Sequence, residues 1–497
     1  MPYFVQQKLL YFAHFFCFCL FVCLHAFSVA RVNASEQPFR MLCRAHGADL
    51  CYTPMLHSRL FVNDAKYRER NFPLDQDCSQ DRPLFVQFCG DDPAVLLAAA
   101  RLVEHRCDAI DLNLGCPQGI ARRGHYGAFL LEEQGLLERI VGTLSGAGLA
   151  VPITCKVRVL PTVEATVRLA QALERAGASV LAVHGRTKEQ KKQFTGAVDW
   201  AAIAAIKRAV RVPVIANGGV GTYACVQACL AATGCDAVMS SEAVLENPSL
   251  FEPRPGCPRC RPSVGTAVPS PPPPPPPPPP DARAVAHQRI AQVRLCLEYL
   301  ALCQSHAPAP VACVKPHVFK FLMAHFHDHT DLRDLLAAAR GPAMVAQIRD
   351  IVGTLAQRYG VAPGFPVRKL EDVVATMVRR KDRGNKGARK RKRKERRAVQ
   401  RLLKTQADRA RARNTVVGAD LGSVADSANA GRAVKRAKFS FGTVLYEEEG
   451  ENTTALAGGG GGAVDVDADG PGPCPACVWG AYYTRHYKPW EVHGEEG

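Results

Sequence analysis

The chain has 497 residues, 47% of them hydrophobic, which is long enough for two domains with a substantial core plus tails. Most of the net charge of +17 comes from residues 379–413, which hold 18 Lys or Arg and three acidic residues, so the rest of the chain is close to neutral. Such a basic tail favours polyanions, with nucleic acid first, and it equally suits nuclear import. The 20 cysteines are scattered, which excludes a small disulfide-stapled secreted domain and favours a reducing compartment.

The first 32 residues form a hydrophobic leader. Residues 9–30 are almost uniformly apolar and aromatic, which is typical of a signal peptide or an anchor helix.

Residues 49–243 alternate short apolar runs with longer Ala- and Leu-rich helical stretches. The expected strands are residues 49–55, 84–88, 109–113, 153–157, 180–184, 212–217 and 237–241. Alternation at this spacing predicts a parallel sheet. A TIM barrel needs eight strands, and residues 27–32, ahead of a helix expected over 37–46, are the candidate for the eighth. A doubly wound open sheet is the alternative.

Composition divides the chain into five parts. They are the leader (1–32), a barrel domain (33–252), a Pro-rich linker (253–281) with ten consecutive prolines, a helical domain (282–360) and a basic low-complexity tail (361–497). The predicted fold is therefore an α/β TIM (β/α)8 barrel followed by a smaller all-helical domain and a basic, largely disordered C-terminal tail. The pairs Cys257/Cys260 and Cys474/Cys477 each have half of a zinc-site spacing, but they lie far apart among Pro and Gly, so we expect no metal site.

A set of mostly polar residues stands where the expected strands end. They are Met55, Gln87, Asn113 with Cys116, Lys156, His184, Asn217 with Gly218 and Gly219, and Ser241 with Glu242. In a barrel these positions converge on the C-terminal rim, where active sites are built. The glycines after strands seven and eight would let backbone N–H groups approach phosphate oxygens. Together with Lys156 and His184 they predict a phosphate-bearing cofactor, whereas the glycines alone would indicate only tight turns.

Eight ordered motifs give the chain a specific resemblance. They are DLCYTPM (49–55), VQFCG (86–90), DLNLGCPQ (111–118), RRGHYGAFL (122–130), CKVRV (155–159), VHGRT (183–187), IANGGV (215–220) and SSEAVLENPSLF (240–251). In these motifs the chain resembles the tRNA-dihydrouridine synthases, most of all the eukaryotic branch that acts on uridines 16 and 17 of the D-loop.

The resemblance implies an FMN enzyme that reduces uridine to 5,6-dihydrouridine in tRNA with NADPH or NADH. By this likeness Cys116 is the general acid that protonates C5 of the uracil. The residues implied to bind FMN are Gln87, Lys156, His184, Asn217, Gly218, Gly219, Ser241 and Glu242. A thiol can act as an acid near neutral pH if its surroundings keep it protonated.

The implied tRNA contacts come from both domains. Asn113 and Arg186 are candidates at the barrel, with a structural salt bridge as the other reading of Arg186. Lys315 and Lys320, on an expected helix, are candidates in the helical domain, where a solvated helix face is the alternative. Two rival functions remain: an FMN-dependent barrel oxidoreductase acting on a small pyrimidine-like molecule, and a tRNA-binding protein without catalysis.

The leader conflicts with this reading. Where the family has a Pro-Met pair at the end of the first strand, this chain has Ala30 and Arg31. Either the leader is a genuine anchor beside an altered first strand, or it is a misassigned start. We expect the second, and with it a cytoplasmic or nuclear protein, or one found in both, without a stable protein partner.

Overall fold

The computed structural model describes residues 26–28, 35–191, 194–252, 282–306, 311–341 and 343–378, which belong to one compact unit. Ala30 and Arg31, the Pro-rich linker, both Cys-x-x-Cys pairs and the basic run at 379–413 lie outside these residues. Among the helices in the described part of the chain, none is both long enough and apolar enough to cross a membrane.

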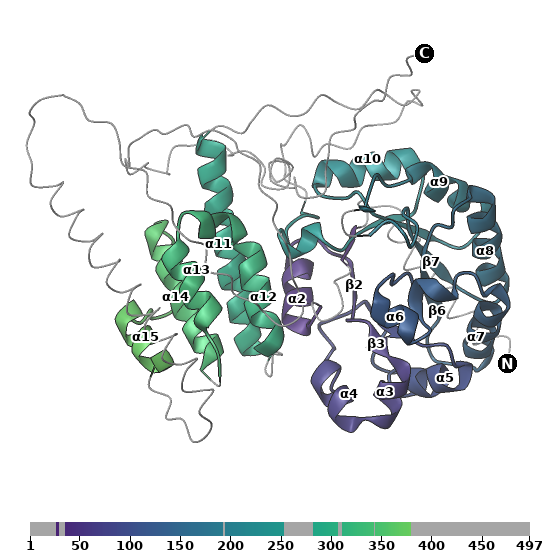
Figure 1. The fold of residues 1–497 in the computed structure, drawn as a ribbon, viewed down its shortest axis with the longest axis horizontal. Helices are drawn as coiled ribbons and strands as arrows, with labels where there is room; N and C mark the ends of the chain where they lie inside the picture. The colour runs from purple at the N-terminus through teal and green to yellow at the C-terminus, as the bar shows by residue number, and fades with distance from the viewer. Residues whose placement is uncertain are drawn as a thin grey trace, which may run out of the picture. The chain divides into compact units, whose positions relative to one another are not determined.

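Eight parallel strands close into a ring, as predicted for a TIM barrel, and the open-sheet alternative is wrong (Figure 1). In order around the ring they are β1 (Ala26–Ser28), β2 (Leu50–Tyr52), β4 (Leu84–Cys89), β5 (Ala109–Leu114), β6 (Ile153–Arg158), β7 (Val180–His184), β8 (Val214–Asn217) and β9 (Ala237–Ser240). A short extra strand, β3 (Leu56–His57), pairs with β4 and was not expected.

The strand that completes the ring lies where the sequence placed it, although it is shorter and begins one residue earlier than the expected 27–32. Phe27 pairs with Leu50 of β2 on one side and with Met239 of β9 on the other. The ring is therefore closed through β1, and β2 also pairs with β4.

Helices surround the ring, in the arrangement that βα units require (Figure 1). They are α2 (Gln37–Ala45), α3 (Ser58–Asn63), α4 (Ala65–Asn71), α5 (Pro93–Arg101), α6 (Gly119–Arg123), α7 (Gln134–Gly146), α8 (Val163–Arg175), α9 (Trp200–Ala209) and α10 (Tyr223–Thr233), with 3-10 turns η1 (Gly127–Leu130) and η3 (Ala243–Leu245). Several begin at an Asp or Thr whose side chain accepts a first-turn N–H, as Asp92, Thr162, Asp199 and Thr222 do.

The interior of the barrel changes from apolar to polar along the strands. Alternate residues of a strand point to the same face. A buried apolar cluster fills more than one level of the ring: Leu50, Tyr52, Phe85, Ala109, Val180, Ala182, Ile215, Ala237 and Met239. Two residues further along β4, β5, β7 and β8, on the same face, stand Gln87, Asp111, His184 and Asn217. The strands thus deliver polar side chains to their carboxyl ends above an apolar floor.

The helical domain comprises α11 (Ala282–Ser305), α12 (Val311–Phe321), η4 (Met323–His327), α13 (Thr330–Ala338), α14 (Met344–Arg358) and α15 (Leu370–Val378). The helix α14 packs against α11, α12, α13 and α15. Because Val373 and Val374 of α15 are buried, the folded part continues beyond residue 360, where the sequence analysis began the tail.

A buried polar group, here called the clamp, joins the barrel to the helical domain. It consists of Glu36, just before α2, Tyr299 of α11 and His317 of α12. The carboxylate of Glu36 accepts from the Tyr299 hydroxyl at 2.5 Å and lies 3.1 Å from His317 Nε2. The ring of Phe39 stacks on His317, with 4.3 Å between ring centroids.

Candidate active site at the barrel rim

Strand register brings most of the candidate residues side by side. Asn113 of β5 pairs with Lys156 of β6, and His184 of β7 pairs with Asn217 of β8. Since all the strands are parallel, these positions share the carboxyl-terminal end of the ring. The convergence expected from the strand ends is therefore present.

Cys116 is held by a hydrogen-bonded loop directly after β5. The side-chain oxygen of Asn113 accepts the backbone N–H groups of Gly115 (3.2 Å) and Cys116 (3.0 Å), while its Nδ2 donates to Gln87 Oε1 at 2.7 Å. An Asn that closes a turn on its own backbone in this way fixes the residues that follow it. The thiol is thus positioned by the amide that precedes it.

The thiol is partly buried beside an apolar cluster. It packs against the buried cluster of Cys89, Ala121 and Tyr126, against which Met55 and Phe129 also pack. Burial raises the pKa of Cys116, against the smaller effect of nearby hydrogen bonding and cations. The side chain is therefore a protonated thiol at neutral pH, as an acid must be.

Gly127 approaches the Cys116 loop too closely to carry a side chain. Its φ is +71°, and a Cβ there would lie 2.8 Å from the carbonyl oxygen of Cys116. That oxygen accepts the N–H of Ala128 at 3.1 Å. A glycine is thus required for this turn to pack against the loop.

Cations cluster beside the Cys116 loop, on the neighbouring strand β6. The ammonium of Lys156 donates to Asn217 Oδ1 at 3.2 Å, and Arg158 donates to the carbonyl oxygens of Gly115 (2.8 Å) and Thr187 (2.7 Å). Burial and the nearby Arg158 lower the pKa of Lys156 to about 8. Burial and the charge of Arg186 lower the pKa of Arg158 to about 10. These lowered pKa values show that it costs free energy to keep the buried, neighbouring cations of the rim protonated.

His184 belongs to the same group of side chains. Burial, followed by the charges of the neighbouring cations, holds the pKa of His184 well below its usual range, so the imidazole is neutral. Nη1 of Arg186 lies 3.5 Å from His184 Nε2, and Arg186 Nε donates to the carbonyl of Gly196 at 3.2 Å. A neutral imidazole can donate to or accept from a ligand without adding charge.

The loops after β8 and β9 complete the ring. Asn217 Nδ2 donates to Met239 O at 2.9 Å and lies 3.5 Å from Ser241 Oγ. Gly218 has φ +103°, and a Cβ there would meet the His184 ring at 2.8 Å. Gly219 and Glu242 continue these two loops, and Glu242 precedes η3. Close packing of glycine backbone against His184 leaves room for backbone donors at this end of the site.

The chemistry of this donor set suits an electron-rich group that carries a phosphate. Lys156 and Arg158 supply positive charge, Gln87 and Asn113 supply amide hydrogens, and the loops supply backbone N–H groups. Metal-ligand clusters of three or more His, Cys, Asp or Glu are absent from the described part of the chain.

Comparison with known proteins assigns the family. The profile described as dihydrouridine synthase (Dus) matches residues 29–263. The rat tRNA-dihydrouridine(16/17) synthase-like protein is 44% identical over 338 residues, which cover 67% of this chain and 69% of that protein. The chain belongs to the dihydrouridine synthase family.

Two further relatives support the assignment to the dihydrouridine synthases. The mouse tRNA-dihydrouridine(16/17) synthase-like protein is 45% identical over 64% of this chain, and the chain spans 59% of that protein's length. The tRNA-dihydrouridine(16/17) synthase of Schizosaccharomyces pombe is 37% identical over 66% of this chain and 76% of its own length. The names of all three relatives include NAD(P)+ as the partner of the reaction.

Lys315 and Lys320, the candidates on the helical domain, contact other parts of the protein. Lys315 Nζ donates to the carbonyls of Ala337 (2.5 Å) and Ala339 (3.1 Å), at the end of α13. Lys320 forms an ion pair with Glu246 at 3.3 Å. Glu246 is the residue directly after η3. The role of both lysines in binding tRNA stays a prediction.

The sequence analysis missed three residues at or just beneath the rim. Arg158 ties the Cys116 loop to the loop after β7, while Asp111 and Thr154 lie buried beside Gln87. Strand alternation was the available signal, since 111, 113, 154, 156 and 158 share the inward face with the strand ends already chosen.

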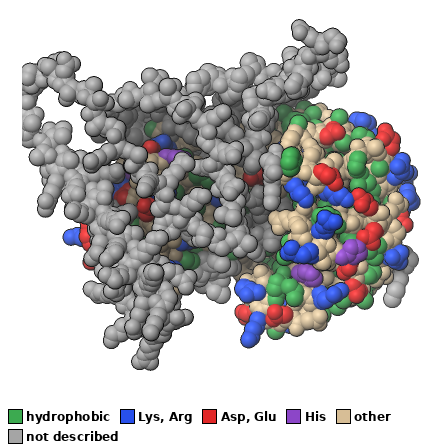
Figure 2. Space-filling model, in the orientation of Figure 1, with side chains coloured by type: hydrophobic (Ala, Val, Ile, Leu, Met, Phe, Trp, Pro, Cys, Tyr) green, Lys and Arg blue, Asp and Glu red, His purple; other side chains and the backbone are tan. Residues whose placement is uncertain are grey.

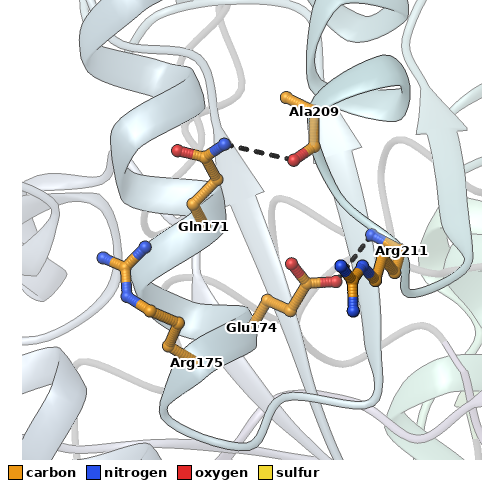
Figure 3. A pocket seen from close by; sticks show the side chains of 5 residues that line it. All are labelled: Gln171, Glu174, Arg175, Ala209 and Arg211. Atoms are coloured by element: carbon orange, nitrogen blue, oxygen red, sulfur yellow. Dashed lines mark hydrogen bonds between the residues drawn. The ribbon is translucent and has the colours of Figure 1, made fainter.

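A surface pocket elsewhere on the barrel does not belong to this site. Figure 3 shows it between α8 and the segment before β8, lined by Gln171, Glu174, Arg175, Ala209 and Arg211. Glu174 accepts the N–H groups of Arg211 and Val212, and Gln171 donates to Ala209 O. These contacts join α8 to the amino-terminal end of β8, away from the rim.

Proposed function

We propose that this chain is a flavin-dependent tRNA-dihydrouridine synthase that reduces uridines 16 and 17 of the D-loop. The observation that carries the proposal is a partly buried, protonated Cys116 that shares one barrel rim with Lys156, Arg158 and a neutral His184. The names of the relatives support the substrate position and the use of NAD(P)H.

The rim residues would hold FMN by complementary charge and hydrogen bonding. Lys156 and His184 would face the ring and its side chain, and the loops at 217–219 and 241–242 would hold the phosphate. When bound, the flavin supplies the hydride that reaches C6 of the uracil, with NAD(P)H as the source of that hydride.

Cys116 completes the addition. Its thiol donates a proton to C5 as the hydride arrives at C6, and the resulting thiolate recovers a proton from solvent, so the sum is uridine, NAD(P)H and H+ giving dihydrouridine and NAD(P)+. Lys156 favours negative charge in the site before the proton is transferred. The NH2 group of Asn113 keeps one hydrogen beyond its bond to Gln87, and this hydrogen would donate to a uracil carbonyl oxygen.

The surface beside Cys116 suits a nucleic acid. Ile120 and Phe194, on the loops after β5 and β7, are 56% and 70% exposed. Lys191 Nζ joins those loops by donating to Pro117 O at 2.9 Å. Exposed apolar side chains can stack against the neighbours of an extruded base. Over the face of the barrel in Figure 2 charges of both signs are mixed, so RNA would also need the basic residues near the site and in the tail.

The proposal is tested with the full chain, its FMN content and unmodified tRNA made by transcription. We expect bound FMN, NAD(P)H oxidation that depends on tRNA rather than on free uridine, and dihydrouridine at positions 16 and 17. Cys116→Ala should lower dihydrouridine formation at least about 100-fold while FMN stays bound. Cys225→Ala, which removes another partly exposed thiol on α10, is the matched control.

Two results would contradict the proposal. A protein that binds no FMN even when the cofactor is supplied would exclude flavin chemistry. Turnover of free uridine as fast as that of tRNA would favour the small-molecule oxidoreductase. A cytoplasmic or nuclear location remains part of the proposal, on the strength of a tRNA substrate and the basic run at 379–413; fluorescence imaging of the tagged full chain tests it.

A further inference from the structure

A buried carboxylate lies at the centre of the barrel, directly below the site. Asp111 is 0% exposed, in the middle of β5. Its register partners are Gln87 on β4 and Thr154 on β6. The proposed chemistry gives Asp111 no contact with substrate or cofactor, although burying a charge here is costly.

Hydrogen bonds connect this carboxylate to the Cys116 loop. Thr154 Oγ1 donates to Asp111 Oδ1 at 2.6 Å, and Gln87 Nε2 donates to Asp111 Oδ2 at 2.8 Å. Asn113 Nδ2 then donates to Gln87 Oε1 at 2.7 Å. Asn113 Oδ1 finally accepts the N–H of Cys116 at 3.0 Å. Each of these donor–acceptor distances is shorter than 3.1 Å, so hydrogen bonds connect the core to the Cys116 loop without a break.

The carboxylate of Asp111, at the buried end of this series of hydrogen bonds, determines which atom donates in each of them. An ionised carboxylate only accepts, so the amide of Gln87 must turn its NH2 group toward Asp111 and its oxygen toward Asn113. The amide of Asn113 must then turn its NH2 group toward Gln87 and its oxygen toward the Cys116 backbone. Each NH2 group keeps one hydrogen for a ligand, so the site offers donors at this point.

We propose that Asp111 is a positioning residue, which fixes the amide orientations of Gln87 and Asn113 and through them the Cys116 loop. The inference deepens the proposed function and rests on Cys116 as its acid. A neutral or apolar residue at 111 would let the amides turn over, and the loop would lose its fixed acceptor.

The charge state of Asp111 predicts a pH dependence of turnover. Burial raises its pKa to about 6, against the hydrogen bonds from Thr154 and Gln87 and the charge of Lys156. The titratable groups that sense its charge are Tyr52 of β2 and Cys155 and Lys156 of β6. Charge strengthens the Gln87 hydrogen bond, so turnover should fall as the pH decreases through about 6.

The experiment compares Asp111→Leu with Asp111→Asn and Thr154→Val. Asp111→Leu removes the acceptor of the Gln87 amide, and Asp111→Asn keeps one acceptor oxygen without the charge. Thr154→Val removes the hydrogen bond from Thr154 to Asp111 and leaves that from Gln87. Readouts are turnover on tRNA, thermal unfolding, and the iodoacetamide alkylation rate of Cys116, measured by peptide mass spectrometry with and without FMN. Cys225 serves as the internal reference for alkylation.

We expect Asp111→Leu to lower turnover at least about tenfold and to change the alkylation rate of Cys116 but not of Cys225. Asp111→Asn should retain more activity and lose the decline near pH 6. Thr154→Val removes a hydrogen bond that lowers the pKa of Asp111, so it should move the decline in turnover to higher pH and leave the alkylation rate of Cys116 above that decline at the wild-type value. Equal effects of Thr154→Val and Asp111→Leu would indicate only a disturbed core and overturn the inference.

Two other outcomes also decide the matter. Unchanged Cys116 alkylation in a folded Asp111→Leu protein overturns the inference whatever its activity. If the Leu variant does not fold, Asp111→Asn alone decides, and a pH profile identical to wild type overturns it. Because alkylation is measured without substrate, it still tests the positioning of Cys116 if Cys116→Ala shows that the proposed reaction is wrong.

Discussion

The rim of the barrel and the clamp between α2 and the helical domain both bury charged side chains, but they balance the charge differently. In the clamp the carboxylate of Glu36 is matched within the protein by Tyr299 and His317. At the rim Lys156 and Arg158 donate to neutral oxygens of an amide and of backbone carbonyls. Burial of charge is thus balanced in the clamp, whereas the rim retains a surplus of positive charge.

Whether a buried charge is balanced within the protein distinguishes a structural site from a ligand site better than the polarity of its residues does. In the clamp the charge of His317 and hydrogen bonds keep the pKa of Glu36 below its usual value even though burial opposes them. At the rim burial and the charge of Arg158 lower the pKa of Lys156, and the charge of Asp111 opposes them without outweighing them. A cation that stays perturbed because the protein does not fully balance its charge indicates a site for a ligand that brings negative charge.

The largest expected effect concerns the clamp. Glu36→Ala leaves Tyr299 and His317 without their buried acceptor, so it should lower the free energy of unfolding by about 3–5 kcal/mol. Urea denaturation followed by circular dichroism measures this. Glu36→Gln, which keeps one acceptor, should lose less. If Glu36→Ala lowered turnover of the folded, FMN-loaded protein while stability stayed unchanged, the clamp would belong to the function instead.

The next effect concerns the surplus charge of the rim. Lys156→Met removes a charged donor, so the Kd for FMN should rise by about 10- to 100-fold, with little loss of apoprotein stability. Because the pKa of Lys156 is about 8 in the free protein, wild-type affinity for FMN should also weaken as the pH rises past 8. Titration followed by flavin fluorescence measures both.

A matched lysine provides the control for that prediction. Lys207→Met removes a lysine of α9 whose ammonium lies 2.7 Å from Asp236, so its charge is already balanced. FMN affinity should not change in this variant. Equal loss of affinity in both variants would mean that total charge, and not the rim, determines binding.

The smallest effect concerns a second contact between the barrel and the helical domain. His46 follows α2 and lies 2.9 Å from Glu252 and 2.7 Å from Glu298 of α11. Burial opposes protonation, but hydrogen bonds to the two carboxylates outweigh it and raise the pKa of His46 to about 9. The stabilisation is therefore complete below the unfolded pKa of about 6.5 and lost as the pH rises through 9.

His46→Gln should accordingly lower stability by about 1 kcal/mol or less at pH 6, because both carboxylates are half exposed and screened. The difference from wild type should vanish above the raised pKa. Thermal unfolding at several pH values measures it. His125→Gln, at a more exposed histidine that also lies between two carboxylates, should show a smaller difference. A pH-independent difference at His46 would argue for packing alone.

Local pattern was enough to predict the barrel and most of its rim. Apolar runs followed by helical stretches located seven strands, and the need for an eighth located β1 at Ala26–Ser28. Gln87, Asn113, Lys156, His184 and Asn217 were predicted as rim residues, because a parallel strand carries its last inward side chain to the same edge as its neighbours.

Contacts between segments far apart in the sequence could not be predicted from local sequence patterns. Glu36 and Tyr299 are 263 positions apart, and nothing local to either indicates the other. Lys315 was predicted to lie on a basic helix, but its contacts with the carbonyls of Ala337 and Ala339 could not be read from its neighbours in the sequence. The alternation that places Asp111 on the same inward face as Gln87 was readable, but the direction of their hydrogen bond required the side-chain geometry.

Gly127 also bears on how related sequences can be read. A side chain at this position would collide with the backbone that carries Cys116, so a chain with any other residue at 127 must build this loop differently even if its cysteine is intact. The cysteine alone is therefore an incomplete marker of an active member. Residue 127 offers a second, independent criterion for separating working enzymes from inactive copies in newly determined genomes.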